Sequence, residues 1–208
     1  MVHKVELIKL KMKIFKQETN ISCGIACLRS IFSYYGKELT EKEIFDKTEF
    51  YKLNEGVADP IINLGVTALK FGFKVKYFGY NPIIANNNNP SLEESLKEKS
   101  KSYFDLGKFC VDKALEFLDL GGEIVIDKLN VQKLKSLIDE YKFILVGIRP
   151  AFIKNTSLSH LHKVIIDGYN EKGFHILDPA GEDYFVDFDS FLMAFYNAIP
   201  EALIIKLK

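Results

Sequence analysis

The first clear pattern of apolar positions begins shortly after the N-terminal segment. Apolar residues over 23–35 recur at spacings of three and four, which is typical of a helix with one buried face. Gly36 follows as a C-terminal helix glycine, and Asn20 or Ser22 is expected to be the N-cap. The sequence therefore predicts a buried helix that is preceded by a loop at 17–22.

Further helices are predicted between this helix and the middle of the chain. The pattern Thr40-Glu-Lys-Glu43 is typical of a capping box that opens a short helix. Helical segments are also expected over 56–71 and over the strongly charged stretch 91–119. We interpret residues 81–120 as a helical insertion within a single domain of residues 1–208.

The last third of the chain changes to a strand-like period. The turn at 170–173 predicts that the runs on either side of it form a hairpin. Helices that come first, followed by a mainly antiparallel sheet, indicate an α+β fold. Strands are expected at 73–78, 123–126, 143–148, 162–169, 173–177 and 202–207, with a helix at 130–141.

Composition narrows the classes of function. The chain has 28 basic and 28 acidic residues, without the basic excess of nucleic-acid-binding domains, so no nucleic-acid partner is expected. Three cysteines leave at least one thiol free, which favours a reducing compartment. No apolar stretch is long enough to span a membrane, and the N-terminal segment lacks the pattern of a secretory signal. We therefore expect a cytoplasmic protein whose oligomeric state stays open.

One segment combines the residues that thiol chemistry requires. Cys23 lies at the start of the first predicted helix, where exposed backbone amides stabilise a thiolate. Gly24 carries no side chain beside the sulfur, so a substrate backbone is expected to approach closely there. Gln17 is expected to turn its amide to the same point and to form an oxyanion hole with the Cys23 N–H.

A nucleophilic thiol needs a base, and the chain has four histidines, at positions 3, 160, 162 and 175. His162 opens an apolar strand that would fix its position, so it is the preferred base, with His160 as its rival. Asp178 ends the neighbouring strand and is expected to orient the His162 imidazole, with Asp167 as the weaker substitute. His175 is interpreted as a core or surface residue.

The hairpin sets a condition on this assignment. With a strict two-residue turn at Glu171-Lys172, Asp178 would lie opposite Ile165, whose side chain points away from the His162 face. The sequence therefore predicts a bulge or an odd-register loop within this hairpin.

The remaining candidates have simpler interpretations. Cys27 and Cys110 are expected to be structural residues of the core or of the insertion. His160-x-His162 has no carboxylate or cysteine nearby at ligand spacing, so no metal site is expected. Acyl transfer by a thiol needs no organic cofactor, and none is expected. The Lys/Glu run at 93–101 is typical of a solvated helix face.

Taken in order, these motifs resemble the bacteriocin-leader (double-glycine) processing peptidases and their papain-like relatives. The resemblance is carried by Gln17-x5-Cys23-Gly24-x-Ala26-x-Leu28, by Tyr35-Gly36, by His162 opening a strand that runs to Gly168-Tyr169, and by Asp178-Pro179. It implies a papain-like fold with N-terminal helices packed on a mainly antiparallel C-terminal sheet. It also implies peptide or protein substrates and a site of Cys23, His162, Asp178 and Gln17. The best-known members are fused to a membrane transporter and an ATP-hydrolysing module, and this sequence shows the motifs of neither.

Three functions stay open at this point. The preferred one is a cysteine peptidase or amidase that hydrolyses a peptide or amide bond. An acyltransferase or peptide ligase would use the same residues with an amine or thiol in place of water. A non-catalytic module would only bind a peptide, but the presence of all four candidate residues favours an enzyme.

Overall fold

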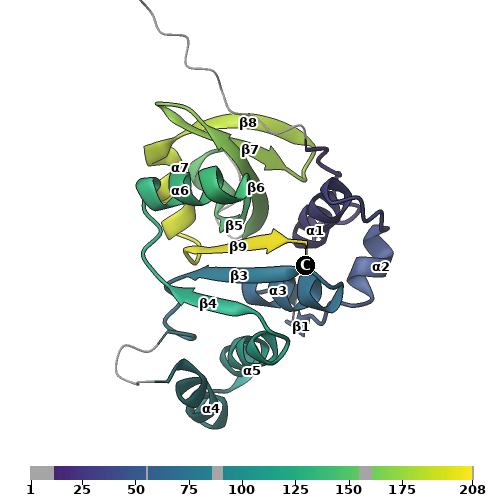
Figure 1. Ribbon diagram of the computed structural model, residues 1–208, viewed down its shortest axis with the longest axis vertical. Helices are drawn as coiled ribbons and strands as arrows, with labels where there is room; N and C mark the ends of the chain where they lie inside the picture. Colours follow the sequence, from purple (N-terminus) through teal and green to yellow (C-terminus); the bar gives the residue numbers. More distant parts are fainter. Residues whose placement is uncertain (1–11, 55, 86–90, 155–160, 208) are drawn as a thin grey trace, which may run out of the picture.

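The computed structural model describes residues 12–54, 56–85, 91–154 and 161–207. Within these residues one seven-stranded sheet has the order β4-β3-β9-β5-β6-β7-β8, and the pair β3–β4 is parallel while the other neighbours are antiparallel (Figure 1). The strands are β3 (Lys74–Gly79), β4 (Glu123–Ile126), β5 (Ile144–Ile148), β6 (His162–Tyr169), β7 (Gly173–Asp178), β8 (Glu182–Asp187) and β9 (Glu201–Lys206). A separate antiparallel pair joins β1 (Tyr51–Lys52) to β2 (Val57–Ala58).

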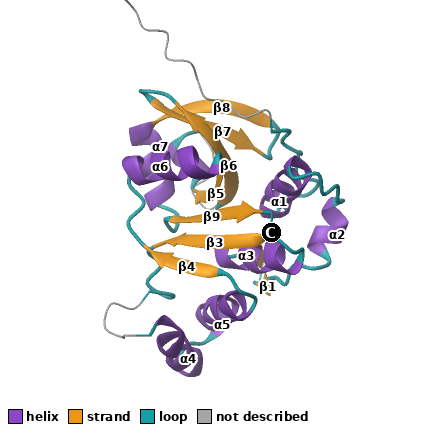
Figure 2. Ribbon diagram, viewed as in Figure 1, coloured by secondary structure: helices purple, strands orange, loops and turns teal. Residues whose placement is uncertain are grey.

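Helices cover both faces of the sheet, as Figure 2 shows. They are α1 (Cys23–Tyr34), α2 (Glu41–Phe45), α3 (Ile61–Lys70), α4 (Leu92–Ser102), α5 (Asp105–Asp119), α6 (Val131–Tyr141) and α7 (Phe188–Tyr196), with a 3-10 turn at Pro150–Phe152. One buried apolar cluster joins α1, α3 and α5 to the sheet, and a second cluster joins α6 and α7 to it. Alternation along β6 sends Ile165 to the first cluster and Val164 and Ile166 to the second.

The helical stretch expected at 81–120 contributes directly to the first of these cores. Val111, Ala114 and Phe117 of α5 are fully buried in the cluster that also contains α1 and α3. The Phe117 ring fills the space next to Gly65, where a Cβ would lie only 2.7 Å from the ring. A larger residue at 65 would therefore push α5 away from α3.

The structure confirms the α+β class and most of the predicted elements, and it corrects three points. The helix expected over 56–71 begins at Ile61, because the preceding residues pair as β2 and Pro60 occupies the N-cap. The sheet is not confined to the C-terminal part, because β3 lies next to β9 within it. The sequence analysis also missed β8 and α7, which follow Asp178.

The predicted bulge is present in the hairpin of β6 and β7. Ile166 pairs with Ile176, whereas Gly168 pairs with His175, so the register shifts by one and Asp167 is the extra residue. Continuing the pairing of Ile165 with Leu177 by one step places Asp178 opposite Val164. Since side chains alternate along a strand, Val164 and His162 share a face, and Asp178 joins them on it.

None of the described helices has both the length and the apolar character that crossing a lipid bilayer requires.

Candidate active site

Cys23 is the first residue of α1, as the sequence predicted. Its side chain is partly exposed, and its sulfur is hydrogen-bonded to the His162 side chain and to the backbone N–H of Lys163. Ser22 occupies the N-cap without a side-chain bond to the helix, because its hydroxyl instead donates to the Thr19 carbonyl oxygen at 3.1 Å. The first amides of the helix are therefore not taken up by a capping side chain, which favours negative charge at the sulfur.

The pKa of the Cys23 thiol lies below its ordinary value of 9.0. Burial alone would raise this pKa, but the hydrogen bond to His162, the positive charge of Lys163 and the bond from the Lys163 N–H together outweigh burial. The thiolate is the nucleophilic form of cysteine, so these contacts favour the form of Cys23 that nucleophilic chemistry requires.

Gly24 has a different role from the one expected from the sequence. A Cβ at this position would lie 2.8 Å from Leu64 Cδ1 and 2.9 Å from Asp59 Oδ2. The missing side chain therefore lets α1 pack against the start of α3, and its space is not open to a substrate. Burial raises the pKa of this neighbouring Asp59 carboxyl to about 6.

His162 is held between the sulfur and a buried carboxylate. Its Nε2 lies 2.6 Å from Asp178 Oδ1, so Nδ1 is the ring nitrogen left to face Cys23. The His162 side chain is 15% exposed and the Asp178 side chain is 5% exposed. Burial lowers the pKa of His162, but the bonds to Asp178 and Cys23 outweigh it and raise this pKa to about 9.

Asp178 is fixed by several further contacts. Its Oδ1 also accepts the Ala180 N–H at 2.8 Å, and its Oδ2 lies 3.3 Å from Lys154 Nζ. Burial raises the pKa of this carboxyl, but the bond to His162 and the positive charges around it lower the pKa to about 2. With these two pKa values, Asp178 is ionised while His162 is protonated between about pH 2 and about pH 9, and over that range its charge stabilises the imidazolium.

Gln17 lies on the loop before α1, and that loop is tied to the turn after β7. Its backbone N–H donates to the Pro179 carbonyl oxygen at 2.8 Å, next to Asp178. Its side-chain Nε2 donates to the Thr19 carbonyl oxygen at 2.7 Å, while its Oε1 is buried and has no hydrogen-bond partner among the described residues. The structure thus anchors Gln17 near Asp178, and its role as an oxyanion donor stays a prediction.

Three residues around the site, Cys27, Lys163 and Lys154, were not assigned to it by the sequence analysis. Cys27, predicted as core, is fully buried, and its Sγ donates to the Lys163 carbonyl oxygen at 3.5 Å. One turn of α1 thus brings two sulfurs against the backbone of the residue that follows His162. The position of Cys27 one turn after Cys23 was a usable signal, and so was the adjacency of Lys163 to His162. Nothing in the sequence pointed to Lys154.

The other histidines and acids have separate places. Asp167, the weaker alternative to Asp178, is hydrogen-bonded to His175 Nδ1 at 2.5 Å and not to His162. Both members of that pair are buried. His3 and the rival base His160 lie outside the described residues.

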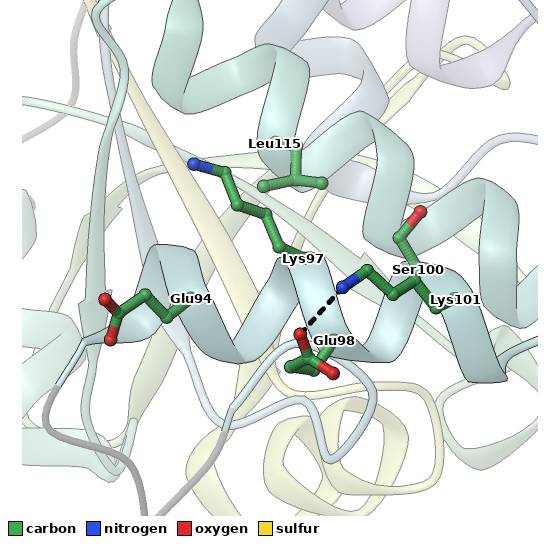
Figure 3. Close-up of a pocket in the computed structure, with 6 residues that line it drawn as sticks. All are labelled: Glu94, Lys97, Glu98, Ser100, Lys101 and Leu115. Atoms are coloured by element: carbon green, nitrogen blue, oxygen red, sulfur yellow. Dashed lines mark hydrogen bonds and ion pairs between the residues drawn. The ribbon is translucent and has the colours of Figure 1, made fainter.

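One surface hollow of the described residues lies away from these groups, between α4 and α5. Its lining consists of Glu94, Lys97, Glu98, Ser100, Lys101 and Leu115, shown in Figure 3. Lys101 and Glu98 form an ion pair along α4 at 2.9 Å, and both side chains are more than 70% exposed. This hollow contains none of the predicted site residues. Across residues 12–54, 56–85, 91–154 and 161–207, no group of three or more metal-ligating side chains is present.

With the site described, comparison with known proteins decides the family. A family model described as the Peptidase_C39 like family matches residues 9–201. The chain belongs to this family. The match includes all four candidate residues and the segment of α4 and α5. No curated protein matches this Peptidase_C39-like chain at a meaningful level of similarity.

Solved structures show the same fold for this family member. One is a double glycine motif protease from an AMS/PCAT transporter in complex with the leader peptide. The two sequences are 16% identical and the TM-score is 0.52, and the match covers 99% of this chain and 100% of that one. Another is the peptidase domain of Streptococcus ComA, a bi-functional ABC transporter involved in a quorum sensing pathway, at 13% identity and a TM-score of 0.54, with 95% and 99% covered. The papain-like fold of the Peptidase_C39-like chain is thereby confirmed.

Proposed function

We propose that this protein is a cysteine peptidase in which Cys23 is the nucleophile, His162 the base and Asp178 the residue that orients the imidazole. The observation that carries the proposal is the hydrogen-bonded series from a thiol at a helix N-terminus, through an imidazole, to a buried carboxylate. Membership of the Peptidase_C39 like family supports the same chemistry. Side chains in this arrangement perform nucleophilic catalysis at acyl groups.

Acylation is the first half of the proposed reaction. The Cys23 thiolate attacks the carbonyl carbon of a peptide bond, a C–S bond forms, and the carbonyl oxygen takes the negative charge. The His162 imidazolium then gives its proton to the leaving nitrogen as the C–N bond breaks. An amine product leaves, and the acyl group stays on Cys23 as a thioester.

Water completes the cycle. Neutral His162 takes a proton from a water molecule, whose oxygen attacks the thioester carbon. The C–S bond breaks, the acid product leaves, and the thiolate and imidazolium are restored. Asp178 stabilises the imidazolium in both halves and keeps the ring in one orientation.

Gln17 is proposed as the side-chain donor to the oxyanion, together with the Cys23 backbone N–H. A carboxamide has two N–H hydrogens, and among the described residues Gln17 uses one of them, toward Thr19. Replacing Gln17 with alanine is expected to lower kcat by about 10²- to 10³-fold with little change in KM. Steady-state kinetics of Q17A measure this. An unchanged kcat would show that the amide does not contact the oxyanion.

A peptide is the proposed substrate class. The structurally similar double glycine motif protease is described in complex with a leader peptide, which supports a peptide-binding cleft in this fold. Two exposed apolar side chains flank the proposed catalytic pair, Ile21 before Cys23 and Leu161 before His162. Both are available to contact apolar residues of a bound peptide.

The proposal is tested by incubating the full chain with mixed peptide pools and identifying the products by mass spectrometry. New termini that carry one oxygen from H₂¹⁸O, together with iodoacetamide labelling of Cys23, are expected. The C23A variant in the same pools is the control. Products joined to an added amine and lacking ¹⁸O would identify an acyltransferase. A Cys23 that labels no faster than a free thiol, with no new product, would contradict the proposal.

A further inference from the structure

The buried pair of Asp167 and His175 lies outside the proposed catalytic series, on the same two strands. By alternation His175 faces the same side of β7 as Leu177, whose side chain belongs to the core beneath α1. Asp178 faces the other side. The pair is thus on the opposite face of the hairpin from His162 and Asp178, and each pair has its own hydrogen bond.

Asp167 is the extra residue of the bulge, so the pair contains the residue at which the register of the hairpin changes. On the turn side of the bulge, Tyr169 pairs with Phe174 and Gly168 with His175. On the other side the register has moved by one residue. A regular ladder without this shift would place Asp178 opposite Ile165, facing away from His162. The contact between Asp178 and His162 therefore depends on the bulge.

The pair joins the bulged residue to the opposite strand at the point where the register changes. Asp167 Oδ1 lies 2.5 Å from His175 Nδ1, and the two side chains are 0% and 8% exposed. A side-chain bond at this position ties the bulge to one location in β6. A slip of the bulge along the strand would break it.

An aspartate at position 167 is a poor choice if its only role is to stabilise the fold. Its Oδ2 is buried without a hydrogen-bond partner among the described residues. Leaving a buried carboxylate oxygen unpaired is costly, whereas an apolar side chain in this place would add to the surrounding core. Departures of this kind from local packing rules are concentrated at functional positions.

We infer that Asp167 and His175 are positioning residues that lock the β6–β7 bulge and thereby hold Asp178 on the His162 face. The inference rests on the proposed function, because the residue positioned is Asp178 of the proposed catalytic series. Neither Asp167 nor His175 touches the reacting atoms.

The test compares H175L, which removes the ring nitrogen, with H175Q, whose amide retains a donor for Asp167. H175L is expected to lower kcat by about 10- to 100-fold at unchanged KM, because small misplacements of catalytic groups have effects of this size. A weaker bond to Asp178 also moves the basic limb of the pH profile to lower pH. H175Q is expected to recover most of both changes. The V186A variant, which removes buried methyl groups from β8, serves as a control that lowers Tm alone.

A double-mutant cycle with D178N separates positioning from general destabilisation. If His175 acts through Asp178, H175L has no further effect on kcat in the D178N background. Additive losses in kcat would overturn the inference, and so would a loss in V186A equal to that in H175L at the same Tm.

The same question can be answered without a substrate, which keeps this inference distinct from the proposed function. The rate of Cys23 alkylation by iodoacetamide against pH reports thiolate formation, and its midpoint is expected to rise in H175L and not in V186A. An unchanged midpoint in H175L would overturn the positioning role. If the midpoint of alkylation rises in H175L but the wild type hydrolyses no peptide, the proposed peptidase function is contradicted and the positioning role is not.

Discussion

Replacing Cys23 with alanine is expected to lower kcat/KM for peptide hydrolysis by at least about 10⁴-fold, the scale seen when a catalytic nucleophile is removed. The physical reason is that no other sulfur in the described chain can take its place. Cys27 is fully buried, and burial raises the pKa of its thiol well above the ordinary value. Cys110 is buried in α5, where burial raises its thiol pKa to about 12.

The matched control for this experiment is C110A, which removes a buried cysteine whose thiol pKa is raised. Its kcat/KM is expected to stay within about twofold of the wild type, because Cys110 lies on α5, outside the hydrogen-bonded series of Cys23, His162 and Asp178. Iodoacetamide is expected to label the wild type and C110A at neutral pH and to leave C23A unlabelled. Substantial hydrolysis by C23A would show that the nucleophile lies elsewhere.

Replacing His162 with alanine is expected to lower kcat by at least about 10³-fold, since the chain loses both its proton acceptor and its proton donor. In the wild type, kcat/KM rises with pH as Cys23 loses its proton, at a pKa below 9.0. It falls again as the His162 imidazolium loses its proton, with a pKa of about 9. Activity therefore requires a pH between these two ionisations.

Without the imidazole, the pKa of the Cys23 thiol is expected to lie above its ordinary value and no longer below it. Burial is the largest influence on that thiol and raises its pKa, and two of the opposing contacts come from His162. The midpoint of Cys23 alkylation against pH should therefore move upward in H162A. D178N, which keeps the ring but neutralises its partner, should give a smaller shift in the same direction. Alkylation of H162A with the wild-type midpoint would contradict the proposed hydrogen bond.

Comparison of sequence and structure shows which features local patterns can determine. The start of α1 at Cys23 followed from apolar spacing, and the turn at Gly36 followed from a glycine that adopts a φ of +77°. The bulge followed from counting residues around the turn, because the two proposed catalytic strands could not otherwise present His162 and Asp178 on one face. Such features depend on a few consecutive residues and on strand alternation.

Features that depend on distant partners were harder to predict. Gly24 was interpreted as leaving room for a substrate, but Leu64 and Asp59 of a later segment fill that space. The stretch from Glu182 to Tyr196 received no assignment, because the apolar residues of β8 are consecutive at 184–186 and do not show the alternation of a strand. A second apolar run follows closely, at 191–196 in α7. No local pattern predicts that Lys154 lies beside Asp178, because 24 residues separate the two.

The position of β9 in the sheet has a consequence for when the protein can fold. This strand is the last described element of the chain, yet it lies between β3 and β5. Until residues 201–206 leave the ribosome, the two halves of the sheet cannot join, and folding must wait for contacts between very distant parts of the chain. Cys23 is therefore synthesised long before the sheet is complete, because the sheet closes only when β9 enters between β3 and β5.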